Sequence, residues 1–252
     1  MIIKFLSLES ARDSLLILEA PILTDLSCRL HYQHNRVIYE PEGSSEELSL
    51  GKGLFWHVLR RIEKVYGDVG RYTDPSERPF IKQEYDLVRK GRASVPMQKY
   101  VNLNDRLLKS YLAFLSRFYK EKNKDNRNEN AAEDKSDDGH HGSAVQYDIA
   151  GLQECSQRIH DGEVVAESKY QKDKGLYNEL IASSDREGLL ACLTVQEVED
   201  VILDKIKDYL QANHHMHPSL SADKGRSFFS EVLIPLTKDV EVEYLLARYG
   251  QR

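Results

Sequence analysis

The residues of this sequence that could do chemistry are charged side chains at helical spacing. In RIHDGEVVAESK, positions 158, 162, 165 and 169 follow the i, i+4, i+7, i+11 spacing of one helix stripe and read Arg, Gly, Val and Lys. A buried helix should carry apolar side chains on such a face. Two cations with little bulk between them therefore indicate either salt bridges to other helices or a site that holds a ligand.

The same pattern recurs on three other segments with helical spacing. Each places a polar side chain on a face that otherwise reads as core, and these residues are Arg12, Glu199, Thr237 and Glu241. Any of the charged ones could form a structural salt bridge, for example Arg158–Glu199 or Lys169–Glu241. Three cations, two carboxylates and a hydroxyl on inward helix faces are expensive to bury unless they serve each other or a ligand.

Sequence motifs for several common chemistries are absent. The stretch GSSEELSLGKG lacks the glycine spacing of a phosphate loop, and no GxSxG or HExxH motif occurs. The histidines of NHHMHP and the pair His140–His141 fall in expected loops, where such tracts are more often incidental than metal ligands. The three cysteines are widely spaced, without a CxxC pair, so we expect reduced thiols and no zinc site.

Composition is that of a soluble globular protein. The chain has 252 residues, 40% hydrophobic and 30% charged, with a formal net charge of −6, which argues against a general surface for nucleic acid or anionic membranes. No apolar run approaches the roughly 20 residues that span a bilayer. Its first residues do not resemble a signal peptide. We expect a cytoplasmic protein, and a secreted form with its signal removed stays open.

Helical periodicity dominates, and strand signals are nearly absent. We therefore predict an all-α fold of about ten helices. Pro21 should bend the first helix near Ile17 or divide it, and Ser143 should cap the longest one. The expected helices cover 7–32, about 52–66, a segment from Asn104 through Phe118, 143–171, 173–183, 185–192, 194–211 and 223–249.

Two segments interrupt this pattern. Residues 120–142 contain almost no apolar side chain, which predicts a long polar loop between two helices. Residues 72–103 hold three prolines and should form an irregular connector. Neither segment separates two independent cores, so we expect one domain over residues 1–252.

Five longer motifs resemble those of the eukaryotic, all-helical (AroQ-type) chorismate mutases. They are SARDSLLILEAPIL, GRYTDPSERPF, QRIHDGEVVAESKYQ, VEDVILDKI and PLTKDVEVEYLLAR. The resemblance runs in order from about residue 6 to 248, and it is strongest over 142–210 and 234–248. It implies the chorismate mutase II-like helical fold, a homodimer, no cofactor or metal, and the rearrangement of chorismate to prephenate.

The resemblance also implies how the substrate is held. Arg12 and Arg158 should bind its two carboxylates, for which a guanidinium fork is well shaped. Thr237 should support one carboxylate, and Glu199 should accept a hydrogen bond from the ring hydroxyl.

By the same resemblance, two residues should stabilise the breaking ether bond. Lys169 should donate to the ether oxygen, and Glu241 should donate to it as a protonated carboxyl. Gly162 and Val165 should form a low floor for the ring. Val195 stands where relatives can carry Asn, so a contact there would come from the backbone.

Regulation is the point at which the sequence departs from the family pattern. Several members respond to tyrosine and tryptophan at a site on the dimer interface. An Arg-Arg pair of that site reads Gly70-Arg71 here, and Gln146 replaces a Thr after Gly142 and Ser143. Arg71, Gly142 and Ser143 are the candidate effector residues, and we expect weak or no control.

Two other interpretations stay open at this level. The chain could be a weakly active or inactive protein of the same fold that binds partners through its surface, for instance as a secreted effector. A metal-binding protein that uses the histidine tracts has little support. Suitable chemistry at all six main positions favours an active enzyme.

Overall fold

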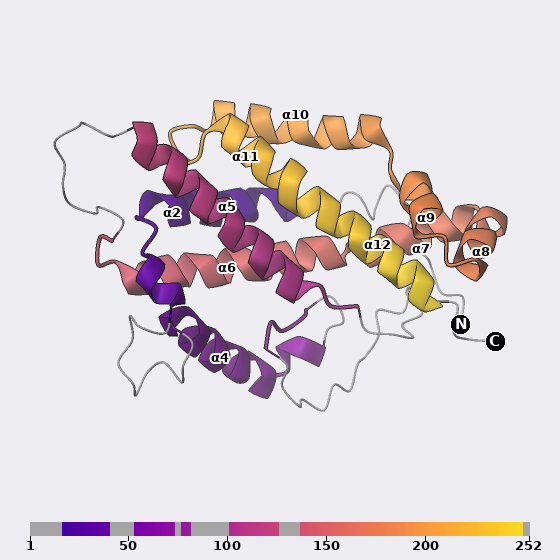
Figure 1. Cartoon of the computed structure of the whole chain (residues 1–252), viewed down its shortest axis with the longest axis horizontal. Coiled ribbons are helices and arrows are strands. Elements are labelled where there is room, and N and C mark those ends of the chain that lie inside the picture. The colour runs from indigo at the N-terminus through magenta and orange to yellow at the C-terminus, as the bar shows by residue number, and fades with distance from the viewer. Residues whose placement is uncertain (1–16, 41–52, 74–76, 82–100, 126–136, 249–252) are drawn as a thin grey trace.

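The computed structural model describes residues 17–40, 53–73, 77–81, 101–125 and 137–248. Arg12 and the expected cap Ser7 lie outside the described residues. The described residues contain ten α-helices and no β-strand (Figure 1), so the predicted all-α fold is confirmed. In chain order the α-helices are α2 (Glu19–His31), α4 (Gly53–Asp68), α5 (Asn104–Asp125), α6 (His141–His160), α7 (Gly162–Lys172), α8 (Lys174–Ala182), α9 (Arg186–Leu193), α10 (Gln196–Ala212), α11 (Ala222–Phe228) and α12 (Ile234–Arg248).

Shorter elements lie between these helices. They are the 3₁₀ turns η1 (Arg36–Tyr39) and η3 (Arg71–Thr73) and the π-helical segment η4 (Phe229–Leu233). None of the described helices is both long and apolar enough to cross a membrane. The expected helices at 52–66, 173–183, 185–192 and 194–211 are confirmed, with ends that shift by no more than two residues.

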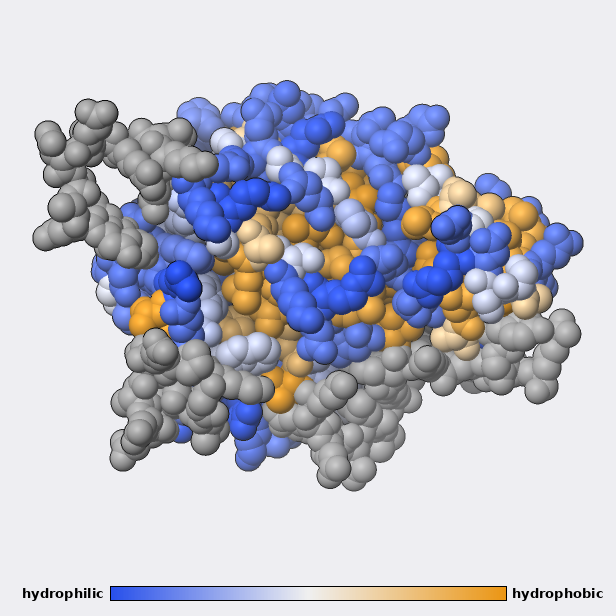
Figure 2. Space-filling view, in the orientation of Figure 1, coloured by the Kyte–Doolittle hydropathy of each residue, from blue (hydrophilic) through white to orange (hydrophobic). Residues whose placement is uncertain are grey.

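Helix α6 forms the centre of the larger core. It packs against α2, α4, α5 and α12, and its side chains Val145, Ile149, Leu152 and Ile159 are at most 3% exposed. Their spacing of four, three and seven residues is that of one helix face. Figure 2 shows hydrophobic side chains between α5 and α12, whereas hydrophilic ones cover α10 along the upper edge of this face.

Helices α7, α8 and α9 pack with α12 around a second, smaller core. Its buried side chains include Ala166, Tyr170, Leu189 and Leu245. Each of α8 and α9 begins with an aspartate cap, because Asp173 and Asp185 accept hydrogen bonds from backbone N–H groups of the first turn. This core fixes α7 and the end of α9 beside α12.

Proline divides the first apolar run as expected. A turn at Leu18 separates Ile17 from α2, which starts at Glu19. Pro21 has no N–H to donate to residue 17, so the preceding helix cannot continue regularly through this point.

The predicted single helix over 143–171 is wrong, because α6 ends at His160 and α7 begins at Gly162. At the junction Val164 N donates to Asp161 O at 3.0 Å, an i to i+3 bond that tightens the chain locally. Ser143 is not the cap either, since α6 already begins at His141. Asp138 instead accepts from the backbone N–H of His140 just before the helix.

The predicted helix over 223–249 is also divided. Residues 222–248 are helical, but the π-helical segment η4 lies between α11 and α12. Pro235 explains its place, since a proline lacks the N–H for residue 231 and its ring clashes with that carbonyl in a regular α-helix. A widened turn before Pro235 relieves this conflict.

The polar loop begins later than predicted. Helix α5 continues to Asp125, whereas the loop was expected from residue 120. Charged side chains find partners there: Glu121 pairs with Lys224 of α11, and the Lys122 ammonium lies 5.7 Å from the ring centre of Tyr119. Such contacts stabilise the polar last turns of α5 beyond its buried apolar side chains, which end at Tyr119.

Candidate active site

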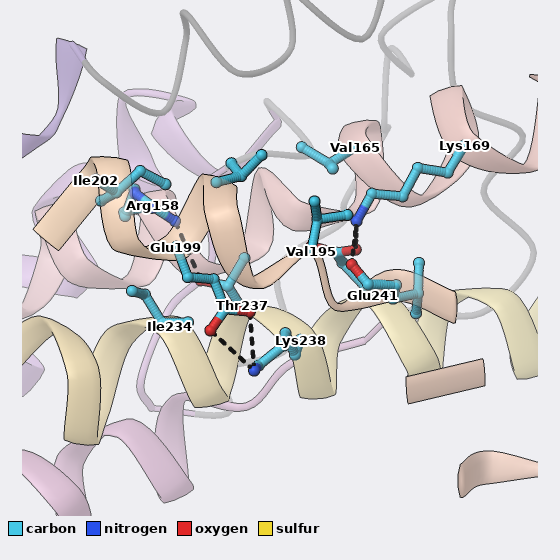
Figure 3. Close-up of a pocket in the computed structure, with 12 residues that line it drawn as sticks. Arg158, Val165, Lys169, Val195, Glu199, Ile202, Ile234, Thr237, Lys238 and Glu241 are labelled. Carbon is cyan, nitrogen blue, oxygen red and sulfur yellow. Dashed lines mark hydrogen bonds and ion pairs between the residues drawn. The ribbon is translucent and has the colours of Figure 1, made fainter. Parts of the chain in front are cut away.

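Helices α6, α7, α10 and α12, with the end of α9, enclose a cavity (Figure 3). Its walls combine polar groups with aliphatic side chains, among them Val165, Val195 and Ile202. The polar lining residues are Arg158, Lys169, Glu199, Thr237, Lys238 and Glu241. The cavity therefore brings together all of the described catalytic candidates, and it adds Lys238.

Arg158 is a buried cation whose N–H donors are not all used by the described residues. It lies in the last turn of α6, is 2% exposed, and donates from Nη1 to Thr237 Oγ1 at 3.1 Å. Within the described part of the chain its Nε has no hydrogen-bond partner. Burial lowers the pKa of this guanidinium below its usual value, yet arginine stays protonated in proteins. An anion in the cavity would satisfy it.

Glu19 is a buried carboxylate close to Arg158 that the sequence interpretation missed. Burial raises the pKa of Glu19 to about 7, while Arg158 and Lys205 oppose the rise. Its Oε1 also lacks a hydrogen-bond partner among the described residues. A signal for it existed, because Glu19 lies four residues after Leu15 on the stripe that carries Arg12.

Lys169 and Glu241 form an ion pair at the other end of the cavity. Lys169 Nζ lies 3.0 Å from Glu241 Oε2 and donates to the backbone carbonyl of Leu193 at 2.6 Å. Glu241 is 5% exposed, and burial raises its pKa although Lys169 and Arg158 lower it. A raised pKa increases the protonated fraction of Glu241, the form that can donate a hydrogen bond.

Thr237 and Gly162 fix the distance between α7 and α12. Thr237 Oγ1 donates to Leu233 O at 2.8 Å and accepts from Arg158. A Cβ added to Gly162 would lie 3.0 Å from Thr237 Cγ2 and 3.1 Å from Thr237 O. Gly162 therefore lies against α12 and is not among the residues that line the cavity, whereas Val165 is. Their expected role as a floor for the ring stays a prediction.

Glu199 and Lys238 form a second ion pair in the cavity. Lys238 Nζ lies 3.0 Å and 3.3 Å from the two carboxylate oxygens of Glu199. Val195 is the N-cap residue of α10 and lines the cavity, and its carbonyl accepts from the N–H of Glu199 at 3.2 Å.

The candidate effector residues are not brought together within one chain. Arg71 donates to Glu77 at 2.9 Å and to Gln153 at 3.2 Å, and its guanidinium lies 4.6 Å from the ring centre of Tyr66. Gln153 follows Ser143 by ten residues of α6, which is about 15 Å of helix rise. Gly142 shares the first turn of α6 with Ser143.

Comparison with known proteins finds chorismate mutases that are similar to this chain in sequence and in structure. No family model matches the chain. The chain is 30% identical to the chorismate mutase of Saccharomyces cerevisiae over 257 residues, which cover 96% of this chain and 95% of the yeast protein.

Two solved structures share the fold over nearly the whole length. The chloroplast chorismate mutase of Zea mays has a TM-score of 0.81 and 28% identity, and the match covers 99% of this chain and 98% of that one. A Candida albicans chorismate mutase in complex with L-Trp has a TM-score of 0.78 and 27% identity, covering 97% and 92% of the two chains.

Proposed function

The chain belongs to the chorismate mutase family, and we propose that its cavity rearranges chorismate to prephenate. The observation that carries this proposal is a buried Arg158, whose Nε has no hydrogen-bond partner among the described residues, opposite a Lys169–Glu241 pair in one cavity. A unimolecular Claisen rearrangement needs a compact substrate conformation and stabilisation of charge on the breaking ether oxygen. It needs no nucleophile and no obligatory proton transfer.

In this proposal Arg158 binds one substrate carboxylate. Its Nε, which has no partner among the residues that the structure describes, and its buried position favour a charge-assisted, two-point contact with that group. Thr237 supports the same carboxylate by turning toward it the hydroxyl proton that here is donated to Leu233 O, while its oxygen accepts from Arg158. Arg12 is proposed for the second carboxylate from the resemblance, and it lies outside the described residues.

Lys169 and Glu241 then bind the ether oxygen together. Their contact at 3.0 Å puts an ammonium and a carboxyl side by side in the cavity, so one oxygen can reach both. Glu241 must be protonated to donate, and burial favours that form. Two fixed donors in a site with little water stabilise the developing negative charge without rearranging.

The remaining lining residues orient the ring. Glu199 accepts from the ring hydroxyl, and the aliphatic side chains of Val165, Val195 and Ile202 exclude water around the carbocycle. Restraint of this kind converts a flexible dianion into the reactive chair-like conformer.

We further propose a cytoplasmic homodimer in which residues 1–252 form one domain. For regulation, a similar chorismate mutase structure with tyrosine bound in its allosteric site and the Candida albicans complex with L-Trp support an effector site in this chain. Arg71 here is held by Glu77 and Gln153, so a response to tyrosine or tryptophan requires its release and should be weak.

The direct experiment follows the loss of chorismate and the appearance of prephenate with purified protein. Wild type should turn over the substrate, and Arg158→Ala and Lys169→Ala should each reduce kcat/KM by about 100-fold or more. Folded wild-type protein without turnover would overturn the proposal and favour a binding protein with this fold.

A further inference from the structure

Lys238 is the charged cavity residue to which the sequence pattern gave no role. It follows Thr237 on α12 and is turned by about 100° from it. Its ammonium contacts both oxygens of Glu199 at 3.0 Å and 3.3 Å, and both residues line the cavity (Figure 3). The two side chains are 23% and 18% exposed.

We propose that Lys238 is a positioning residue, which holds the Glu199 carboxylate in the orientation that accepts the ring hydroxyl of the substrate. This inference rests on the proposed function and deepens it, because it names the pair that recognises the hydroxyl. Without Lys238 the flexible Glu199 side chain could adopt several rotamers in the cavity.

The geometry leaves Glu199 able to accept a further hydrogen bond. A carboxylate offers about four lone-pair sites, and Lys238 contacts each oxygen once. An ionised carboxylate accepts hydrogen bonds and cannot donate them. The pair therefore selects a hydroxyl donor at this end of the ring over an ether or a keto group.

Stability alone does not explain this pair. Partly exposed ion pairs contribute about 0–1 kcal/mol to folding, and this one lies on a concave, functional surface. Glu199 already neutralises Lys238, whereas Arg158 Nε has no hydrogen-bond partner in the described part of the chain, so Arg158 is the better contact for a substrate carboxylate.

The adjacent position provides a matched control. Asp239 pairs with Arg106 Nη2, with side chains 29% and 53% exposed, and it does not line the cavity. Asp239→Asn thus removes an ion pair of the same helix without touching the cavity, and kcat and KM should stay within about twofold of wild type.

The test compares chorismate with an analogue whose ring hydroxyl is replaced by hydrogen. Lys238→Met should raise KM for chorismate about tenfold, the worth of one hydrogen bond to a charged group, with kcat within about threefold. Its KM for the analogue should equal that of wild type, since no hydroxyl is present to be recognised. Lys238→Arg should restore most of the KM for chorismate.

A double variant separates positioning from a general packing role. Glu199→Gln combined with Lys238→Met should be no worse than Glu199→Gln alone, because Lys238 acts through that carboxylate. Equal KM losses on both substrates, additive effects of the two changes, or wild-type kinetics for Lys238→Met would each overturn the inference. These results presuppose wild-type turnover, whose absence would instead remove the proposed function.

If Lys238→Met does not fold, as judged by circular dichroism, Lys238→Gln takes its place with the same expected KM ratio between the two substrates. A ratio for Lys238→Gln equal to that of wild type would likewise overturn the inference.

Discussion

Two buried arginines of this protein have opposite surroundings. Arg29 on α2 is fully buried, and all five of its N–H donors are used: Nε binds Asp148 at 2.8 Å, and the other groups bind two tyrosine hydroxyls and two backbone carbonyls. Arg158 on α6 is equally inaccessible, but its Nη1 reaches only a threonine hydroxyl and its Nε has no partner among the described residues.

The difference separates a structural charge from one prepared for a ligand. Desolvation acts to lower the pKa of Arg29, but Asp148 and the nearby tyrosines raise it above its usual value. For Arg158 desolvation prevails and the pKa is lowered. A buried cation that the protein leaves incompletely bonded is costly, so its presence in a cavity indicates a role outside folding.

The largest expected effect follows from replacing Arg158. Arg158→Met should lower kcat/KM by about 10²–10⁴-fold, because the carboxylate contact of a buried charge pair is worth about 3–5 kcal/mol. Its free energy of unfolding should fall by less than that of Arg29→Met, because among the described residues Arg158 loses one hydrogen bond, to Thr237. Steady-state kinetics and urea denaturation measure the two quantities. A loss of stability that matches the loss of activity would erase the contrast with Arg29.

Arg29→Met should show the reverse pattern. Removing one partner leaves the buried Asp148 unpaired, so the free energy of unfolding should fall by about 3–5 kcal/mol. The folded fraction should keep kcat/KM within about threefold of wild type, because Arg29 does not line the cavity. Urea denaturation followed by circular dichroism checks the stability. Unchanged stability would show that the number of hydrogen bonds made by each guanidinium does not distinguish Arg29 from Arg158.

Helical spacing predicted many of the residues that line the cavity, but it could not distinguish Arg158 from Arg29. Arg158, Lys169 and Glu241 stood out because they fall on core-like stripes within recognisable motifs. Arg29 also lies among apolar side chains, and only three-dimensional contacts show that its donors are used. Lys238 precedes Glu241 by three residues, yet its partner Glu199 comes from another helix, which no spacing reveals.

The helices themselves were predicted best where local signals determine their ends. Helices α8 and α9 begin at aspartate caps that the sequence displays. The break at Asp161 was missed because α7 must turn to lie against Thr237, a contact between residues far apart in sequence. Pro235 was visible, but its effect, a π-helical segment, lies in the preceding turn.

A smaller effect is expected from replacing Glu241, which pairs with Lys169 in the cavity. Burial raises the pKa of Glu241, and its protonated form is the proposed donor. Activity should therefore be full below that pKa and fall as the pH rises through it. Glu241→Gln, which donates at every pH, should reduce kcat/KM about tenfold at low pH and remove most of this dependence. A pH–rate profile that keeps its falling limb in Glu241→Gln would refute the assigned role.

The smallest effect is expected from widening the close contact between α7 and α12 at Gly162. Gly162→Ala places a methyl group 3.0 Å from Thr237 Cγ2, so α7 and α12 must separate by a few tenths of an ångström. We expect a loss of about 1–3 kcal/mol in stability and a several-fold lower kcat. Gly142→Ala, where an added Cβ meets nothing within 4 Å, is the control for both measurements. Equal stability and equal kcat for the two variants would show that neither quantity depends on the close contact between α7 and α12.

Calorimetric titration tests most directly whether Arg158 is held ready for a substrate carboxylate. The ligand is an unreactive bicyclic dicarboxylate that mimics the transition state of the rearrangement. We predict that Arg158→Met binds it at least about 100-fold more weakly than wild type, and that Asp239→Asn binds it within about twofold. Equal dissociation constants for wild type and Arg158→Met would contradict the claim that this arginine is held ready for a substrate carboxylate.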